Sequence, residues 1–520
     1  MATRTLFLRA SFLCSLLSLV APMAWFAAAT AQTPPAVSFP ASMIQSAVPH
    51  DVPAGSSASV QDLAIFAWQE FIALNWPSVD PATTGLRGTP DTNADFLNIK
   101  KDADGSFPLL VWQTYRHKNE LFPSDGMTDP NFDSKKPTYK YNSVLPLMPG
   151  ANNPTFDLFN NLDEASQIGL CTMFAQNTIQ IAYEAKVNRA LFDYANRTKL
   201  TACNSSGTCP TLETALANTK SNLAKFGGIC TAPTGTSGPV VTLPCGDAAV
   251  AGPAGEGAIE IKAAWRALTQ KEISGGRFLT RKVIFYTGQQ FGQLLYQNEV
   301  WGLVALHIIH KTKSFPTFVF ATWEQIDNYD DANNKNTEDL RFHNIAGTPL
   351  PPDIPVTRAH PIHSQIPPVN DAVHATFTAK DPSTIWQYYK LVGVQGAPIT
   401  GPPAAGSPID DLSYYYLANI VVETNQTLQN FFGAVDPTKE TPVPFKNVYL
   451  NGASGSPFQM GGCQGCHGTQ GQSVGGDMSR LIAVAPSNSN GPPDPIGNDA
   501  ASAVRAYLER SKDGLRRARK

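Results

Sequence analysis

Two cysteines and a histidine lie close together near the end of this 520-residue chain. Residues 460–472 read MGGCQGCHGTQGQ, so Cys463, Cys466 and His467 follow the order C-x-x-C-H. Two thiols at this spacing can bond the two vinyl groups of one porphyrin, and the adjacent imidazole can bind its iron from the proximal side. The pattern therefore predicts one covalently bound haem c, attached at Cys463 and Cys466, with His467 as a ligand of the iron.

A redox disulfide, a metal site and chance could also give rise to this motif. With 8 Cys and 9 His in the chain, about 0.002 such motifs are expected from composition alone. A thioredoxin-like pair needs a strand before it and a helix that begins at the motif, whereas here glycine-rich sequence lies on both sides. A zinc site needs further Cys or His nearby, and none follows His467. Haem attachment is favoured, and a redox pair, a metal site and chance remain as alternatives.

The late CQGCH resembles the motif of c-type cytochromes that carry one haem. The chain is also similar to large, poorly characterised bacterial exported proteins of the cytochrome c family. Three further segments carry that similarity: FAWQEFIALNWP (66–77), FVFATWEQIDN (318–328) and YLANIVVET (416–424). This resemblance covers most of the chain after its N-terminal leader. It implies haem c, electron transfer with a redox partner protein and a periplasmic location, and it implies no settled activity for the large N-terminal part.

The surroundings of the motif differ from those in a small cytochrome c. In that family a helix runs directly into C-x-x-C-H, whereas the nearest helix expected here, over residues 410–433, ends 30 residues before Cys463. A methionine ligand usually follows several tens of residues after the motif, and no such methionine is present. The haem is therefore expected to lie against the larger part of the protein, and not in a standalone cytochrome domain.

The iron ligand opposite His467 has several candidates. Met478 is the only methionine after the motif, and a thioether ligand would raise the reduction potential. A histidine of the large domain could be this ligand instead. The candidates, in the segments LHIIHKT and HPIH, are His307, His310, His360 and His363. If residues 303–310 form a strand, His307 and His310 face opposite sides and do not bind one metal together. An open position is the third alternative, and it would allow chemistry at the iron.

The first 31 residues have the pattern of a signal peptide. A short basic start precedes an apolar run over residues 10–28, and the tripeptide ATA at 29–31 is a typical cleavage pattern. No other stretch of about 18 apolar residues occurs, so no transmembrane segment is expected. The sequence predicts a periplasmic or otherwise exported protein, cleaved at about Ala31/Gln32.

Cys14 belongs to the expected signal peptide, and the five other cysteines outside the motif agree with an oxidising compartment, where loop cysteines are usually paired. Cys203 and Cys209 lie on either side of NSSGT, and Cys230 and Cys245 lie at the ends of a Pro/Gly/Thr-rich loop. We expect two local disulfides, with Cys171 free and buried. Five cysteines permit other pairings, and spacing alone does not choose among them.

Composition bounds the domain organisation. Hydrophobic residues make up 42% of the chain, enough for a substantial core, and 39 Gly and 42 Pro indicate much loop. A net charge of -3 gives no reason to expect nucleic-acid binding. We expect a large domain over residues 32–409, with a helical, disulfide-containing part at 160–250 and a β-rich part at 257–325. Residues 410–520 are expected to form a small, mainly helical haem-binding region.

Periodicity predicts an α+β fold with large irregular regions. Apolar spacing predicts helices over residues 59–77, 177–199, 211–226, 410–433 and 499–518. The first of these has a capping box at Ser59 and Asp62. Four runs rich in β-branched and aromatic residues between 257 and 325 predict an antiparallel sheet, and the Pro/Gly-rich residues 344–410 predict loop.

The favoured function is that of an exported c-type cytochrome that carries one covalent haem and transfers electrons. The size of the N-terminal part motivates a rival, a haem-dependent oxidoreductase whose large domain binds substrate. A third hypothesis is a binding protein in which the haem is structural. The sequence does not establish whether the protein is an enzyme, and it names no catalytic residue.

Overall fold

The computed structural model describes most residues between 37 and 396 and part of the C-terminal region. The described residues are 37–141, 157–165, 171–176, 179–204, 208–290, 293–333, 335–344, 354–355, 362–396, 419, 421, 463–464, 467–468, 471–488, 493–494 and 496. The expected signal peptide lies outside them, as do Cys466, His360, the helix expected at 499–518 and, apart from Asn419 and Val421, the helix expected at 410–433.

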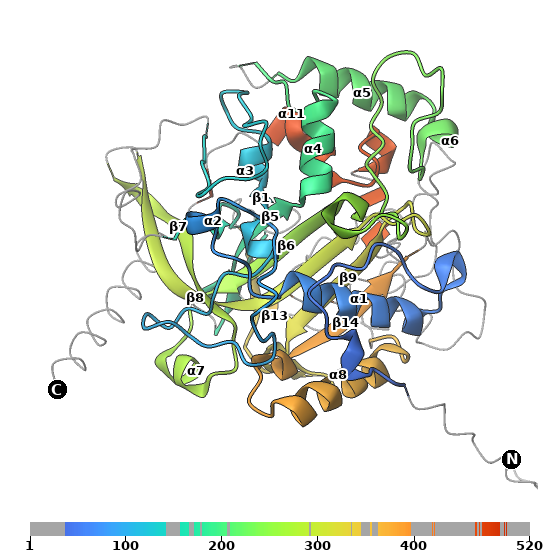
Figure 1. Ribbon diagram of the computed structural model, residues 1–520. Coiled ribbons are helices and arrows are strands. Elements are labelled where there is room, and N and C mark those ends of the chain that lie inside the picture. The colour runs from blue at the N-terminus through green and yellow to red at the C-terminus, as the bar shows by residue number, and fades with distance from the viewer. Residues whose placement is uncertain are drawn as a thin grey trace, which may run out of the picture. The chain divides into compact units, whose positions relative to one another are not determined.

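The main sheet has eight strands and is antiparallel except where β2 meets β7. Its long strands β7 and β8 are seen in Figure 1. Its path runs β1-β5-β6-β8-β7-β2, and β9 pairs with both β8 and β14. The bounds are β1 (Arg116–His117), β2 (Asn161–Leu162), β5 (Ala182–Val187), β6 (Ile259–Arg266), β7 (Thr280–Gln290), β8 (Gln293–His310), β9 (Val319–Gln325) and β14 (Tyr389–Gln395). The antiparallel sheet expected between residues 257 and 325 is confirmed, and with the helices it confirms the α+β class.

Strand β8 is the centre of this sheet. Residues 305–310 pair with β6 along one edge and with β9 along the other. Successive side chains of a strand point to opposite faces. His310 contacts Glu70 on one face, and His307 lies near His467 on the other. The expected separation of His307 and His310 to opposite faces is therefore confirmed.

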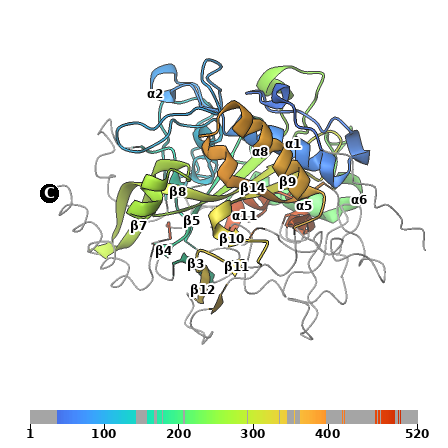
Figure 2. The same cartoon turned by 90° about the horizontal axis from the view of Figure 1, so that it is seen from below.

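Helices α1 (Val60–Leu74) and α8 (Ile366–Lys380) cover one face of β9 and β14, as Figure 2 shows. The α1 helix begins at the predicted capping box, in which Ser59 and Asp62 bond each other's backbone N–H groups, and it ends at Asn75. Its apolar residues extend around most of the helix, so it is buried nearly throughout. Trp68 of α1 donates from Nε1 to Asn370 of α8 at 2.9 Å, which joins the two helices.

The prediction of a helix over residues 177–199 is wrong for the first half of that range. Residues 179–187 form β4 (Ile179–Gln180) and β5, and helix α4 (Arg189–Arg197) follows only after them. Ile179, Tyr183 and Val187 are four residues apart, and a spacing of four fits one face of a strand as well as a helix. The alternation of IQIAYEAKV, with apolar residues at every odd number, is the signal of period two that decides for strand.

The helices of the disulfide-containing part follow these strands. Residues 211–226 form α5 (Pro210–Ser221) and α6 (Leu223–Phe226), as expected, with a break at Asn222. Upstream, β3 (Cys171–Ala175) belongs to a second sheet of order β13-β12-β3-β4, with β12 (Arg341–Asn344) and β13 (Ile354–Pro355). The part at 160–250 that was expected to be helical is thus a mixture of strands and helices in its described residues.

The prediction that residues 344–410 are loop throughout is wrong. They contain α8 and β14, joined by a 3-10 turn, η6 (Ile385–Tyr388). The two prolines of IPPVNDAVHATFTAK stand in the first turn of α8, where the backbone N–H has no partner within the helix. Proline there marks the beginning of a helix, which is why composition alone misassigned the segment.

Shorter elements complete the described chain. They are α2 (Pro81–Thr84), α3 (Lys118–Leu121), α7 (Gln270–Gly275), α11 (Arg480–Asn488), β10 (Tyr329–Asp330), β11 (Lys335–Asn336), and the 3-10 turns η1 (Ala41–Met43), η2 (Gly55–Ser57), η3 (Trp112–Thr114), η4 (Gly252–Gly255), η5 (Ile326–Asn328) and η10 (Gln472–Val474). None of the helices in the described part of the chain has the length and apolar character needed to cross a bilayer.

Both expected disulfides are present, Cys203–Cys209 and Cys230–Cys245. Replacing Cys230 and Cys245 together with alanine is expected to lower the free energy of unfolding by about 3 kcal/mol, because the bond closes the longer loop. The same change at Cys203 and Cys209, whose sequence separation is 6 against 15, is expected to cost about 2 kcal/mol. Urea unfolding without reductant measures both, and an equal or reversed order would contradict the loop-length argument.

Candidate cofactor site

The beginning of the C-x-x-C-H motif lies on the main sheet. Gln464, directly after the partly buried Cys463, donates its backbone N–H to Oε1 of Gln395 at 3.0 Å. Its side-chain amide donates to the backbone carbonyls of Thr317 and Phe318 at 3.0 and 3.1 Å. These bonds hold the motif at the beginning of β9 and the end of β14.

His467 has the hydrogen bonding expected of a metal-binding imidazole. Its Nδ1 lies 2.9 Å from the backbone carbonyl oxygen of Met478. Because a carbonyl only accepts, Nδ1 is assigned the proton, which leaves the lone pair on Nε2 to bind a metal. Burial, and to a smaller extent His307, lowers the pKa of His467 to about 3. The imidazole is therefore neutral near pH 7, the form that binds iron.

Two rings of the sheet lie next to His467. The Phe320 ring of β9 is 4.8 Å from it, centre to centre and edge-on, and the His307 ring of β8 is 6.2 Å from it. His310 contacts Glu70 of α1, and His307 points to the opposite face of the sheet. Both rings therefore lie on the face away from α1. The site is thus built from the last part of the chain against the middle of the sheet.

A buried ion pair fixes the loop that follows the motif. The ammonium of Lys311 contacts the carboxylate of Asp477, and both side chains are 0% exposed. The same carboxylate oxygen accepts the backbone N–H of Leu243 at 2.7 Å, and Lys311 donates to the carbonyl of Ile229 at 2.7 Å. The loop also contacts α5, beside which α11 lies in Figure 1. The loop is therefore enclosed between the sheet and α5.

Several buried polar atoms around this loop have no hydrogen-bond partner among the described residues: Gln464 Oε1, both amide atoms of Gln472, Ser473 Oγ, Asp477 Oδ1 and Glu260 Oε1. An unpaired buried polar group costs about 1–3 kcal/mol, so such a cluster is a suitable place for a polar part of a bound molecule. The amide and hydroxyl hydrogens of Gln472 and Ser473 are of the kind that bonds a carboxylate, which haem carries on its propionates. Gln472 Nε2 and Ser473 Oγ therefore fit a haem propionate as donors, whereas the amide oxygens of Gln464 and Gln472 only accept and do not.

Glu260 of β6 shares this face of the sheet. Burial raises the pKa of its carboxyl to about 7, against the smaller effect of a hydrogen bond with Ser479. A carboxyl whose pKa rises on folding stabilises the protein fully below pH 4.5, and that contribution is lost as the pH rises through about 7.

Replacing Glu260 with glutamine is expected to remove this loss. At pH 8 the variant should exceed the wild type in unfolding free energy by roughly 3 kcal/mol, and near pH 4.5 the two should be equal. Urea unfolding across this range provides the measurement, with the change of the exposed Glu213 to glutamine as the control. A constant difference between Glu260→Gln and wild type at all pH values would disprove the assignment.

The other candidate iron ligands are placed as follows. Met478 is fully buried, and its backbone lies on the Nδ1 side of His467. Because Nδ1 and Nε2 point to nearly opposite sides of the ring, this placement gives no support to Met478 as the ligand beyond an iron at Nε2. His310 Nδ1 lies 2.5 Å from Glu70 of α1, on the other face of the sheet. His363 accepts the backbone N–H of Gln365 just before α8, also on the side of α1.

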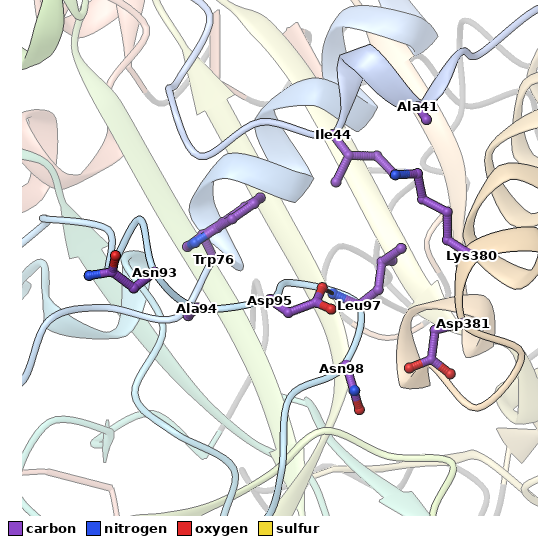
Figure 3. A pocket seen from close by; sticks show the side chains of 10 residues that line it. All are labelled: Ala41, Ile44, Trp76, Asn93, Ala94, Asp95, Leu97, Asn98, Lys380 and Asp381. Atoms are coloured by element: carbon purple, nitrogen blue, oxygen red, sulfur yellow. Dashed lines mark hydrogen bonds between the residues drawn. The ribbon is translucent and has the colours of Figure 1, made fainter.

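A cavity of about 560 Å³ lies elsewhere, beside Trp76 at the end of α1 and Lys380 at the end of α8 (Figure 3). Most of the exposed surface that lines it is polar. The lining residues are Ala41, Ile44, Trp76, Asn93, Ala94, Asp95, Leu97, Asn98, Lys380 and Asp381. It belongs to the face that α1 and α8 cover, across the sheet from His467. A molecule bound in this cavity would not contact the C-x-x-C-H motif.

Within the described ranges, no group of three or more His, Cys, Asp and Glu side chains is arranged to hold a metal ion. No protein-family model, curated protein or solved structure matches the chain. The resemblance to cytochromes therefore stays a prediction from the motif and the quoted segments.

Proposed function

We propose that the protein is an exported c-type cytochrome with one covalent haem, attached at Cys463 and Cys466 and ligated by His467, and that it transfers single electrons to and from a redox partner protein. The observation that carries the proposal is the hydrogen bond between Nδ1 of His467 and the backbone carbonyl of Met478, at 2.9 Å. That bond fixes the ring and its tautomer, which an iron ligand requires. The two disulfides fit an oxidising compartment outside the cytoplasm.

When bound, haem supplies a reversible one-electron change at its iron. The chain supplies the surroundings. Gln464 and Asp477 hold the segment on both sides of His467 against the sheet. The apolar ring of Phe320 lies against the partly buried His467 and limits the access of water, which is one of the ways in which a protein sets the reduction potential.

The test is maturation of the full chain in the periplasm of a host that makes c-type cytochromes. The expected result is one haem per chain that stays with the protein after denaturation and acid–acetone extraction. The Cys463→Ala/Cys466→Ala variant should lack it. The Cys230→Ala/Cys245→Ala variant is the matched control, since it removes two cysteines of this protein and should retain the haem. A wild-type chain without covalent haem under these conditions would refute the proposal.

A further inference from the structure

A second imidazole lies beside His467 and comes from a distant part of the chain. His307 is in the middle strand β8, with 6% of its surface exposed, and points to the face of the sheet on which the motif lies. The two ring centres are 6.2 Å apart, and their planes are inclined by 43°. The strand pairs on both edges at this point, with Lys262 and with Thr322, so the backbone of His307 is firmly placed.

This separation suits two imidazoles that share one metal. A bond from a histidine nitrogen to a metal is about 2.0–2.1 Å long, so two rings that bind one iron from opposite sides have centres about 6 Å apart. Rotation of either ring about its metal–nitrogen bond leaves this distance unchanged, so the inclination of the planes is compatible with ligation. The two ring centres therefore already lie at the distance that such a pair requires.

The remaining described candidates are less well placed. The backbone of Met478 lies on the side of His467 away from Nε2, and His310 and His363 lie across the sheet. We infer that His307 is the second axial ligand of the iron, an inference that rests on the proposed haem at His467. The site then consists of one ligand from the C-terminal motif and one from the centre of the large domain.

One side chain has to move for this arrangement. The Phe320 ring lies 4.8 Å from His467 and 6.1 Å from His307, and therefore beside the line that joins the two imidazoles. A porphyrin between the imidazoles would extend into that position. Phe320 would then turn aside and pack against the edge or face of the porphyrin, an ordinary contact for an aromatic residue.

Ligation by two histidines has consequences that can be measured. With both axial positions filled by protein nitrogens, the iron is low-spin in both oxidation states and has no position for added ligands. Its reduction potential is lower than that of a haem with one histidine and one methionine ligand, because the thioether favours the reduced iron.

The experiment uses the holoprotein and three variants: His307→Ala, His307→Met and His363→Ala. Wild type and His363→Ala, the matched control, are expected to give low-spin spectra and to bind no carbon monoxide after reduction. His307→Ala should become high-spin and bind carbon monoxide, and added imidazole should restore the low-spin spectrum. His307→Met, which keeps a ligating side chain if the alanine variant does not fold, should stay low-spin with a higher reduction potential.

The outcomes separate this inference from the proposed function. If covalent haem is present but His307→Ala keeps the low-spin spectrum of the wild type, another residue is the ligand and the inference is wrong. A wild-type holoprotein that is high-spin and binds carbon monoxide has an open position, which also overturns the inference while the proposed function stands. An absence of covalent haem removes the proposed function and, with it, this inference.

Discussion

Replacing Glu120 with alanine is expected to lower the free energy of unfolding by roughly 4 kcal/mol, one of the two largest effects we expect from any single change. The carboxylate of Glu120 accepts hydrogen bonds from Nη1 and Nη2 of Arg87, at 2.9 and 3.1 Å, and from Nη1 of Arg116 at 2.8 Å. The side chains of the two arginines are 0% and 3% exposed. Alanine would leave two buried guanidinium groups without their shared carboxylate, and removing one partner of a buried ion pair is strongly destabilising.

The pH dependence of stability provides a second measurement at Glu120. Burial by itself would raise the pKa of this carboxyl, but Arg87 and Arg116 hold it at about 2. A carboxyl with a lowered pKa stabilises the fold above its unfolded value of 4.5, and this stabilisation is lost as the pH falls towards 2. Guanidinium unfolding should show this loss in the wild type and not in Glu120→Ala. The exposed Glu213→Ala is the control, expected to change stability by less than about 1 kcal/mol. Equal effects of the two changes would contradict the argument.

Replacing Lys311 with methionine is expected to cost about 4 kcal/mol and to release the loop after the motif. Methionine keeps much of the side-chain length but leaves the fully buried carboxylate of Asp477 without its cation. Burial already raises the pKa of Asp477, so the loss of the ammonium favours protonation or exposure of this group. Because Asp477 lies ten residues after His467, we expect limited proteolysis to cut the C-terminal loop faster, in addition to the change in urea unfolding.

Two further variants test whether the pair acts as a unit. Lys313, two residues away and exposed, is the matched control, and Lys313→Met should leave both stability and proteolysis unchanged. In the double variant Lys311→Met/Asp477→Asn, the amide can still accept the N–H of Leu243 and no buried charge remains. This double variant should recover at least about 1 kcal/mol relative to Lys311→Met. If the two single effects simply add, Lys311 and Asp477 are not coupled.

Local patterns predicted the parts of the fold that neighbouring residues decide. The capping box at Ser59 correctly located the beginning of α1, and the β-branched runs located β6 to β9. The strand β5 was misassigned because Ile179, Tyr183 and Val187 satisfy both periods, and α8 was missed because its prolines suggest loop. In both cases the position of each residue within the element decides whether a segment is helix, strand or loop, and composition does not contain that position.

Local sequence likewise predicts some residues of the candidate site and not others. The motif and the proximal role of His467 can be proposed from five consecutive residues, and the bond to Met478 spans only eleven. The contacts of Lys311 with Asp477 and of His307 with His467 cross more than 150 residues, so no local pattern contains them. A partial signal was present in β6 and just after β8, where Glu260 and Lys311 interrupt apolar runs. A charge within a strand that is buried on both faces indicates a buried partner, without naming it.

The contacts of the motif and of the loop after it also bear on the order in which the chain folds. Gln464 and Asp477 bond residues 243, 311, 317, 318 and 395, all of which are synthesised well before the motif. The sheet can therefore form while the last segment is still emerging, and closure of such long loops is among the slower steps of folding. If haem is attached as proposed, the motif would be accessible to the attaching enzyme during that interval, and less so once Gln464 and Asp477 have made these bonds. Faster docking of the C-terminal segment would then reduce the yield of holoprotein, so maturation would depend on timing as well as on affinity.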